Sequence, residues 1–250
     1  MRLPSLLPAL LLLVPFPAAL RAAQAPPVRQ VTRMLDDLFR SKSSLAEVEL
    51  VSRTDTQDRR LKLRMWTKGQ DRSLIIIDEP ERDAGTATLR VGNNLWNYLP
   101  KIARTIRVPP SMMLASWMGT DFTNDDLVKD SSYEHDFRFG PGAPSRDPAG
   151  WLYTGVARAG VVGRWQKIEW VVDAEGSLPL LARYFDRKGL LARTMSFSRV
   201  ERMGGRLLPT LMVLKSVDQP GHVMELRYLS ARFDIPLSDD TFSLSRLERR

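Results

Sequence analysis

The sequence predicts a mainly β protein of the α+β class, in which a strongly curved antiparallel sheet of about a dozen strands forms an unclosed half β-barrel. Three observations predict this fold. Short stretches of alternating apolar and polar residues follow one another from residue 45 to residue 231. Turn sequences such as Gly92-Asn93 and Gly204-Gly205 separate them, as in β-hairpins. An amphipathic helix precedes the strands, and a methionine-rich stretch among them predicts short lid helices.

Composition bounds the class of protein. The chain has 250 residues, of which 43% are hydrophobic, and this supports one sizeable core in a single domain. The absence of cysteine excludes structural disulfides, thiolate metal sites and a lipid-modified N-terminal cysteine. The net charge is +8, with lysines and arginines scattered among acids. A solvated basic surface is the simplest interpretation; contact with anionic lipid headgroups or an acidic partner is favoured over nucleic acid.

Residues 1–25 resemble a secretory signal peptide. Arg2 supplies the positive end, residues 6–20 are largely apolar, and small residues follow at Ala22, Ala23 and Ala25. An uncleaved membrane anchor is the alternative, but prolines interrupt the apolar stretch, which is too short to span a bilayer. We expect residues 26–250 to form one soluble periplasmic domain without a lipid anchor.

The first half of the domain begins with a helix and continues as strands. Val28, Val31 and Leu35 share one helical face, which predicts an amphipathic helix over 28–39. Period-two patterns predict strands over 45–51, 60–66, 84–91, 95–99 and 103–107. Residues 74–77 are apolar on both faces, which indicates a central strand that is covered on both sides.

A stretch rich in methionine and tryptophan follows these strands. Ser111, which follows two prolines, is predicted to cap a helix, and Gly119 ends the apolar helical segment 111–118. Thr123 or Asn124 then caps a second short helix over 125–127. Flexible methionine side chains suit a mobile flap over a ligand. The alternative is a plug that only closes one end of the core.

The second half of the domain is a long antiparallel meander. We expect an edge strand over 131–139 and a polar loop over 140–150. Further strands are predicted over 151–157, 165–172, 180–186, 191–200, 206–215 and 223–231, before a short terminal turn at 242–244. A sheet of this size has a wide concave face that few helices fill, which predicts a ligand cavity. A completely filled core is the alternative.

Residues 96–127 also resemble a known family. The matching residues are Trp96-Asn-Tyr-Leu-Pro100, Arg104, Ile106, Met118-Gly-Thr-Asp-Phe122 and Asp125-Asp-Leu127. Together they resemble the outer-membrane lipoprotein-sorting protein family, the LolA-like periplasmic carriers. The resemblance extends more weakly over residues 30–245. It implies a half-barrel that receives or delivers lipids, or the acyl chains of lipoproteins, between membranes.

The resemblance implies partners and a lid. The partners would be an inner-membrane transporter, an outer-membrane acceptor and, transiently, a membrane surface. In the well-studied carrier an arginine on an early strand locks the lid, but Arg53, Arg59, Arg60 and Arg64 match no motif here, so none is assigned this role. We expect no cofactor. Our candidate cavity and lid residues are Trp96, Tyr98, Met112, Met113, Trp117, Met118 and Phe122.

The sequence offers little catalytic chemistry. His135 lies between two acids, but in a strand their carboxylates would point away from the imidazole, which disfavours a metal site. The acids at 121, 125 and 126 fit helix capping better than a catalytic pair. We therefore expect no enzyme. Two alternatives to a carrier stay open: an accessory protein of an envelope transporter that holds no lipid, and a hydrolase of envelope lipid or glycan.

Overall fold

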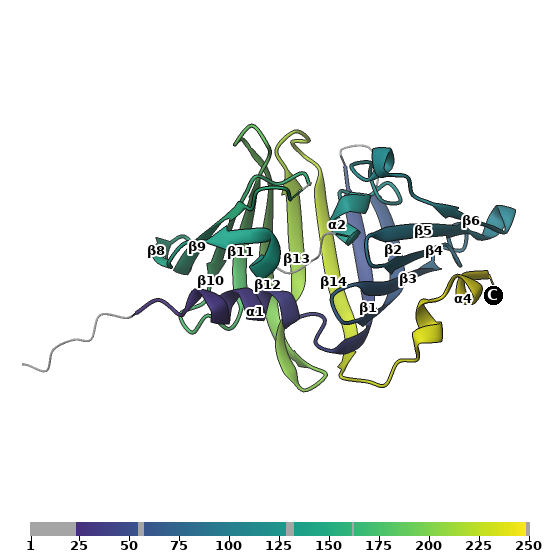
Figure 1. Cartoon of the computed structure of the whole chain (residues 1–250), viewed down its shortest axis with the longest axis horizontal. Coiled ribbons are helices and arrows are strands. Elements are labelled where there is room, and N and C mark those ends of the chain that lie inside the picture. The colour runs from purple at the N-terminus through teal and green to yellow at the C-terminus, as the bar shows by residue number, and fades with distance from the viewer. Residues whose placement is uncertain (1–23, 55–57, 129–132, 162, 249–250) are drawn as a thin grey trace, which may run out of the picture.

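The computed structural model describes residues 24–54, 58–128, 133–161 and 163–248, so most of the expected signal peptide lies outside the described residues. Figure 1 shows one large curved sheet with short helices around it. The helices are α1 (Val28–Asp37), η1 (Pro100–Ile102), η2 (Pro110–Met112), α2 (Asn124–Val128), α3 (Tyr133–Asp136), η3 (Asp239–Phe242) and α4 (Leu244–Glu248). The strands are β1 (Ser43–Arg53), β2 (Asp58–Lys68), β3 (Arg72–Glu79), β4 (Ala87–Val91), β5 (Asn94–Leu99), β6 (Arg104–Arg107), β7 (Phe137–Phe139), β8 (Ala143–Arg146), β9 (Ala149–Ala157), β10 (Lys167–Val172), β11 (Pro179–Phe185), β12 (Leu191–Met203), β13 (Arg206–Ser216) and β14 (Val223–Phe233).

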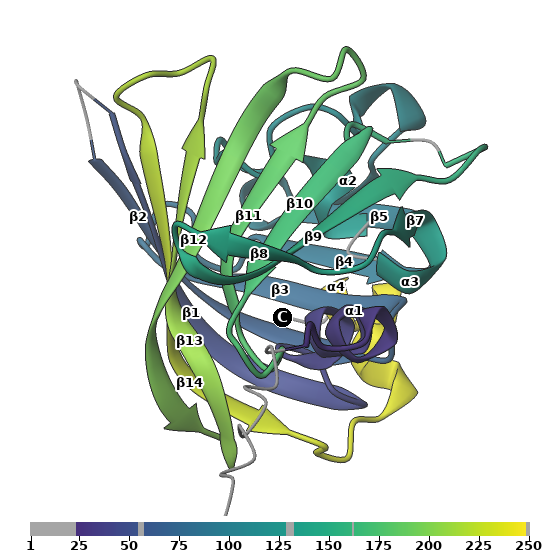
Figure 2. The same cartoon turned by 90° about the vertical axis from the view of Figure 1, so that its left-hand side faces the viewer.

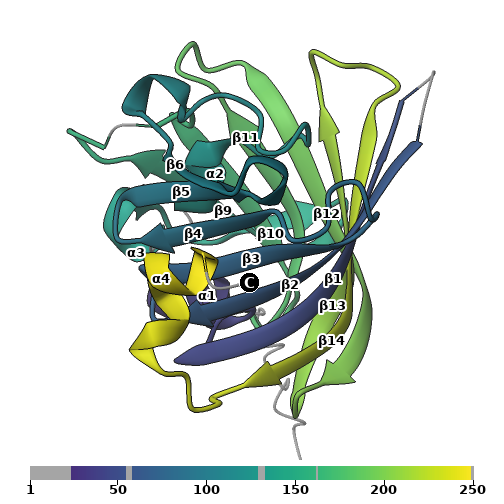
Figure 3. The same cartoon turned by 90° about the vertical axis from the view of Figure 1, so that its right-hand side faces the viewer.

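The sheet has 14 strands, and each paired neighbour is antiparallel. The order is β6-β5-β4-β3-β2-β1-β14-β13-β12-β11-β10-β9-β7, with β8 paired to β9. The pairing of β1 with β14 joins the two halves of the chain, from Ser44 opposite Phe233 to Arg53 opposite Val223. The sheet curves strongly but does not close into a barrel (Figures 2 and 3). The predicted open half-barrel is therefore confirmed.

The concave face of the sheet carries the main core. Inward side chains from both halves meet there, because alternate residues of each strand share a face. These side chains include Ala46, Val48, Leu50, Leu61, Leu63, Ile75, Ile77, Ile168, Trp170, Tyr184, Met195, Phe197, Met212, Leu214 and Met224. Helix α1 lies across the opening of this face (Figure 2), and its Val31 is buried against Tyr153 and Val172.

The convex face of β3–β5 carries a second core. Leu74 and Ile76 belong to it, whereas Ile75 and Ile77 face the main core, so the predicted two-sided strand is confirmed. The C-terminal segment covers this face through Phe242 and Leu247, and Figure 3 shows α4 beside β3 and β4. A continuous apolar run is stable here because each of its two faces has its own cover.

Three predicted elements differ from the structure. Residues 133–136 form α3 rather than a strand, because the Asp36 carboxylate accepts a hydrogen bond from the Tyr133 N–H at 2.7 Å and α3 packs on α1. Residues 131 and 132 lie outside the described part. The predicted loop 140–150 contains β8, where Pro144 is tolerated beside β9 at the margin of the sheet.

The predicted helix 111–118 is mostly irregular. Only the turn η2 at 110–112 is helical, and Met118 has a left-handed φ of 51° that a helix does not allow. The short helix after Thr123 is confirmed as α2. Among the described residues, no helix combines the length and apolar character needed to cross a membrane.

Candidate functional site

A cavity of about 250 Å³ lies between the concave face of the sheet and the elements that cover it. Its floor is apolar and comes from both halves of the sheet. The main floor residues are Val48, Leu50, Leu63, Met65, Ile75, Ile168, Met195, Phe197, Met212, Leu226 and Tyr228. The cover consists of the C-terminal end of α1, α3 with β7, and a flap that we define as residues 110–128. The predicted cavity therefore exists, although side chains fill much of the concave face.

Aromatic side chains line the second half of the floor. The Trp170 ring lies 5.4 Å from Tyr133, 5.5 Å from Phe197 and 6.3 Å from Tyr184, measured between centroids. Phe39 stacks on Tyr228 at 5.1 Å. Such rings offer large apolar surfaces at small cost in rotamer freedom, which suits the binding of a chain without fixed shape.

The flap inserts Trp117 into this space. Its ring is buried, and its Nε1 donates a hydrogen bond to Thr88 Oγ1 at 2.9 Å, so the polar edge of the indole is satisfied inside the core. Phe122 and Leu127 of the flap also line the cavity. Thr123 caps α2: its Oγ1 accepts from the Asp126 N–H at 3.1 Å, and Asp126 Oδ2 accepts from the Thr123 N–H at 2.8 Å.

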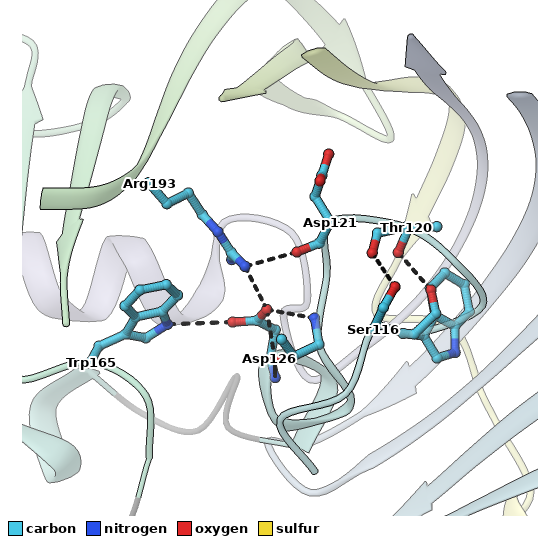
Figure 4. A network of polar contacts seen from close by, with 8 residues as sticks. Ser116, Thr120, Asp121, Asp126, Trp165 and Arg193 are labelled. Atoms are coloured by element: carbon cyan, nitrogen blue, oxygen red, sulfur yellow. Dashed lines mark hydrogen bonds and ion pairs between the residues drawn. The ribbon is translucent and has the colours of Figure 1, made fainter. Parts of the chain in front are cut away.

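A buried ion pair ties the flap to the opposite half of the sheet. Arg193 on β12 is 2% exposed, and its Nη2 donates to Asp126 Oδ2 at 3.0 Å and to the Asp121 carbonyl oxygen at 2.8 Å (Figure 4). The guanidinium carbon lies 4.8 Å from the centroid of the Trp165 ring, and Trp165 Nε1 donates to Asp126 Oδ1 at 3.4 Å. Because the flap follows β6, this contact spans the open side of the half-barrel.

Within the flap, two hydroxyls hold the irregular backbone. Figure 4 shows Ser116 donating to the Thr120 carbonyl. The Thr120 hydroxyl in turn donates to the Trp117 carbonyl at 2.7 Å. Arg59 on β2 donates to the Met118 carbonyl and also pairs with Asp83 at 3.2 Å. Of the four early arginines that the sequence left unassigned, Arg59 is therefore one that contacts the flap.

A second polar chain ties the flap to β1 and to the turn before β14. Ser52 Oγ lies 2.7 Å from His222 Nε2, and His222 Nδ1 lies 3.3 Å from Asp121 Oδ1. Serine hydrolases use these residue types in the same order. Here, however, His222 Nδ1 lies closer to Gln219 Oε1, at 2.6 Å. Ser52 sits inside a ladder between two strands rather than on a sharp turn beside oxyanion donors. We interpret this chain as a structural tie.

The pKa of Asp121, which belongs to this tie, is shifted. Burial raises the pKa of its carboxyl above the ordinary 3.8, while His222 and Arg193 act to lower it and Asp218 acts to raise it. The burial effect is the largest of these. The charged form of Asp121 is therefore less stable in the folded protein than in water.

The structure separates the seven candidate residues into three groups. Trp117 and Phe122 line the cavity, and Met118 packs against the main core without lining the cavity. Met112 is exposed and Met113 is half-buried. Trp96 and Tyr98 lie in the second core under the C-terminal segment, because alternation along β5 turns them to the convex face and leaves Leu95 and Asn97 on the concave one.

Sequence reasoning missed the residues that hold the flap. Arg193 and Trp165 lie far along the chain from Asp126, and no local pattern links them. One available signal was the arginine within the apolar alternation of residues 191–197, since an arginine at an inward position requires a buried partner. His135 lies in α3, not in a strand, and the described residues contain no group of metal-ligating side chains.

Comparison with known proteins identifies a matching family model and solved structures with a similar fold. A family model with the description "Uncharacterized protein" matches residues 69–249. No curated protein matches the chain. A DUF1329 family protein from Desulfovibrio piger is 23% identical, with a TM-score of 0.77 over 88% of this chain and 99% of that chain.

Two further solved structures carry sorting-protein names. An outer membrane lipoprotein-sorting protein domain from Vibrio parahaemolyticus is 20% identical, with a TM-score of 0.74 over 88% of this chain and 98% of that one. A LolA superfamily protein from Nitrosomonas europaea is 20% identical, with a TM-score of 0.73 over 90% of this chain and all of that one (100%). The chain therefore belongs to the family that its matching model describes as uncharacterized proteins, and it has the LolA-like fold that residues 96–127 indicated.

Proposed function

We propose that this protein is a periplasmic carrier that shields lipid, or the acyl chains of lipoproteins, between its curved sheet and its flap during transfer across the envelope. The single observation that carries the proposal is the apolar, aromatic-lined cavity on the concave face. Its work is binding rather than bond making. Trp117 and Phe122 contact the cargo, and Arg193 with Asp126 holds the flap over it.

The size of the cavity requires the flap to move. Ligand pockets typically enclose about 300–1,000 Å³, so a cavity of about 250 Å³ is small for a long acyl chain. Loading would displace flap side chains from the floor. The irregular backbone of 111–119 and the flexible side chains of Met113 and Met118 suit such a movement.

The test is a pair of tryptophan substitutions on one strand. Leu226 lines the cavity on β14, whereas Leu229 of the same strand is exposed. Leu226→Trp fills the cavity and should reduce bound acyl species at least about tenfold, because the added ring occupies the volume that the chain needs. Leu229→Trp should leave loading unchanged. The measurement is native mass spectrometry of protein purified from an envelope extract, followed by lipid identification.

The small cavity also favours one alternative, an accessory protein of an envelope transporter that holds no lipid. A lipid-free mass, together with no uptake of a fluorescent acyl probe by the parent protein, would contradict the carrier and support this alternative. Loading that is equal in Leu226→Trp and the parent would show that the cargo binds elsewhere than in this cavity.

A further inference from the structure

The segment from residue 101 to residue 114, here called the basic segment, exposes apolar side chains to an unusual degree. It contains η1, β6 and η2, and β6 forms one edge of the sheet (Figures 1 and 3). Twelve large apolar side chains are exposed among the described residues, and four of them lie in this one segment. They are Ile102, Ile106, Met112 and Leu114, at 55%, 46%, 53% and 61% exposure.

The same segment carries positive charge without acids. No acidic residue occurs between Asp83 and Asp121, and Lys101, Arg104 and Arg107 are all exposed. Helix α4 packs beside β6 and bears Glu248, but among the described residues no carboxylate oxygen comes within 4.0 Å of a charged nitrogen of these three cations. The segment therefore presents a cationic field beside its apolar side chains.

The fold explains why these apolar side chains stay outside. Trp117 and Phe122 already occupy the inward positions of the flap, which leaves Met112 and Leu114 on its outer side. Charged residues alone are enough to protect a sheet edge from pairing with another chain. Protection of the sheet edge explains Arg104 and Arg107 but not the four exposed apolar residues. Each of these side chains gives up the favourable free energy that its burial would contribute to folding.

We propose that the basic segment is a docking surface for anionic lipid bilayers. Its cations would lie at the phosphate headgroups while its apolar side chains enter the boundary between headgroups and acyl chains, the pairing that characterises interfacial segments. The segment overlaps the flap at residues 110–114, so docking brings the flap to the membrane. Docking is separate from the carriage of cargo, because the residues that would contact the membrane lie on the surface and not in the cavity.

The experiment measures binding of the purified protein to sedimented vesicles. Parent protein should bind vesicles in which about one lipid in four carries a phosphoglycerol headgroup, and it should bind neutral phosphocholine vesicles much more weakly. Lys101→Gln with Arg104→Gln should weaken binding about 25-fold, since each cation near such a surface contributes about fivefold. Met112→Glu with Leu114→Glu should weaken it at least about tenfold, since it removes two inserting side chains and adds repulsion.

Matched controls come from the β12–β13 hairpin, which lies away from β6 in Figures 1 and 3. Val200→Glu with Leu207→Glu changes two similarly exposed apolar residues, at 49% and 51%, and Arg199→Gln with Arg202→Gln makes the same change of net charge. Both control pairs should bind like the parent. Unchanged circular dichroism melting shows that every variant is folded.

Three results would overturn the docking proposal. They are no binding of the parent to anionic vesicles, equal losses in segment and control variants, and binding only to a soluble acidic polypeptide. The carrier proposal fails separately. Lipid-loaded protein that does not bind vesicles overturns docking alone. Protein that binds vesicles through this segment, but carries no lipid and takes up no acyl probe, supports docking and contradicts the carrier.

Discussion

Arg193 forms a buried ion pair with Asp126 of the flap. Its guanidinium group forms an ion pair with the Asp126 carboxylate, donates to the backbone carbonyl of Asp121 and lies over the ring of Trp165. One side chain therefore connects two residues of the flap with Trp165 outside it. A buried arginine is tolerated because the Asp126 carboxylate compensates its charge. Removal of either partner leaves the other charge buried and unpaired.

Arg193→Met should therefore lower the free energy of unfolding by about 3–5 kcal/mol. The measurement is urea denaturation at neutral pH. Arg183 is the control, because its pair with Glu169 spans 3.8 Å and is more exposed. Arg183→Met should cost less than about 1 kcal/mol. Equal losses in the two variants would mean that the Arg193 pair is no stronger than a surface contact.

Asp121 predicts a pH dependence. Its folded pKa is raised above 3.8, chiefly by burial, so its contribution to stability is complete below pH 3.8 and declines as pH rises through the folded pKa. Asp121→Asn removes this decline. The free energy of unfolding of the variant minus that of the parent should therefore be larger at pH 7 than near pH 4.

Unfolding free energies of parent and Asp121→Asn at several pH values check this prediction. A difference between the two proteins that does not change with pH would contradict it.

Ser52→Ala tests the role of the polar chain. If the chain is a structural tie, this substitution changes the free energy of unfolding only slightly, whereas loss of an esterase turnover would point to the hydrolase alternative.

At the scale of elements, α2 depends on its cap. The five-residue helix is too short to be stable alone, and the reciprocal hydrogen bonds of Thr123 and Asp126 fix its first turn. Thr123→Ala should cost about 1 kcal/mol, and Thr123→Ser should recover most of it. Hydrogen exchange of the α2 amides is the direct measurement, and protection equal to that of the parent in Thr123→Ala would contradict the role of the cap.

The C-terminal segment acts as the cover of the convex face. Phe242 and Leu247 are buried, while Leu244 between them is 42% exposed. Phe242→Ala and Leu247→Ala should each lower the free energy of unfolding by about 2–5 kcal/mol because they leave cavities over β3 and β4. Leu244→Ala is the control and should cost less than about 1 kcal/mol. Chemical denaturation measures all three, and similar costs throughout would mean that the segment does not pack as described.

For the molecule as a whole, the proposed carrier role predicts that a ligand bound in the cavity stabilises the folded state. A ligand that binds only the folded state at 100 times its Kd adds about 2.7 kcal/mol. Long-chain acyl ligands should therefore raise the melting temperature of the parent and not that of Leu226→Trp. An unchanged melting temperature of the parent in the presence of such ligands would count against a cavity that admits them.

The repetition of short alternating strands largely determined the architecture. Each hairpin is local, so turns such as Gly92-Asn93 and the alternation of residues 206–215 specify it from sequence alone. The predictions that were wrong concern segments whose conformation depends on contacts with residues distant in the sequence. Helix α3 depends on Asp36, which lies 97 positions earlier, and residues 111–118 follow the burial of Trp117 rather than their own propensity.

Residue patterns were enough to predict the fold class, the two-sided strand at 74–77, the apolar character of one sheet face and the capped helix after Thr123. Which aromatic side chains face the cavity became known from the folded arrangement, because alternation separates two faces of a strand without saying which one lies on the concave side of the sheet. The folded arrangement also determines the Arg193–Asp126 and His222–Asp121 contacts. Those contacts join β12 and the turn before β14 to a flap that follows β6, and segments so distant in sequence become neighbours only when the sheet curves.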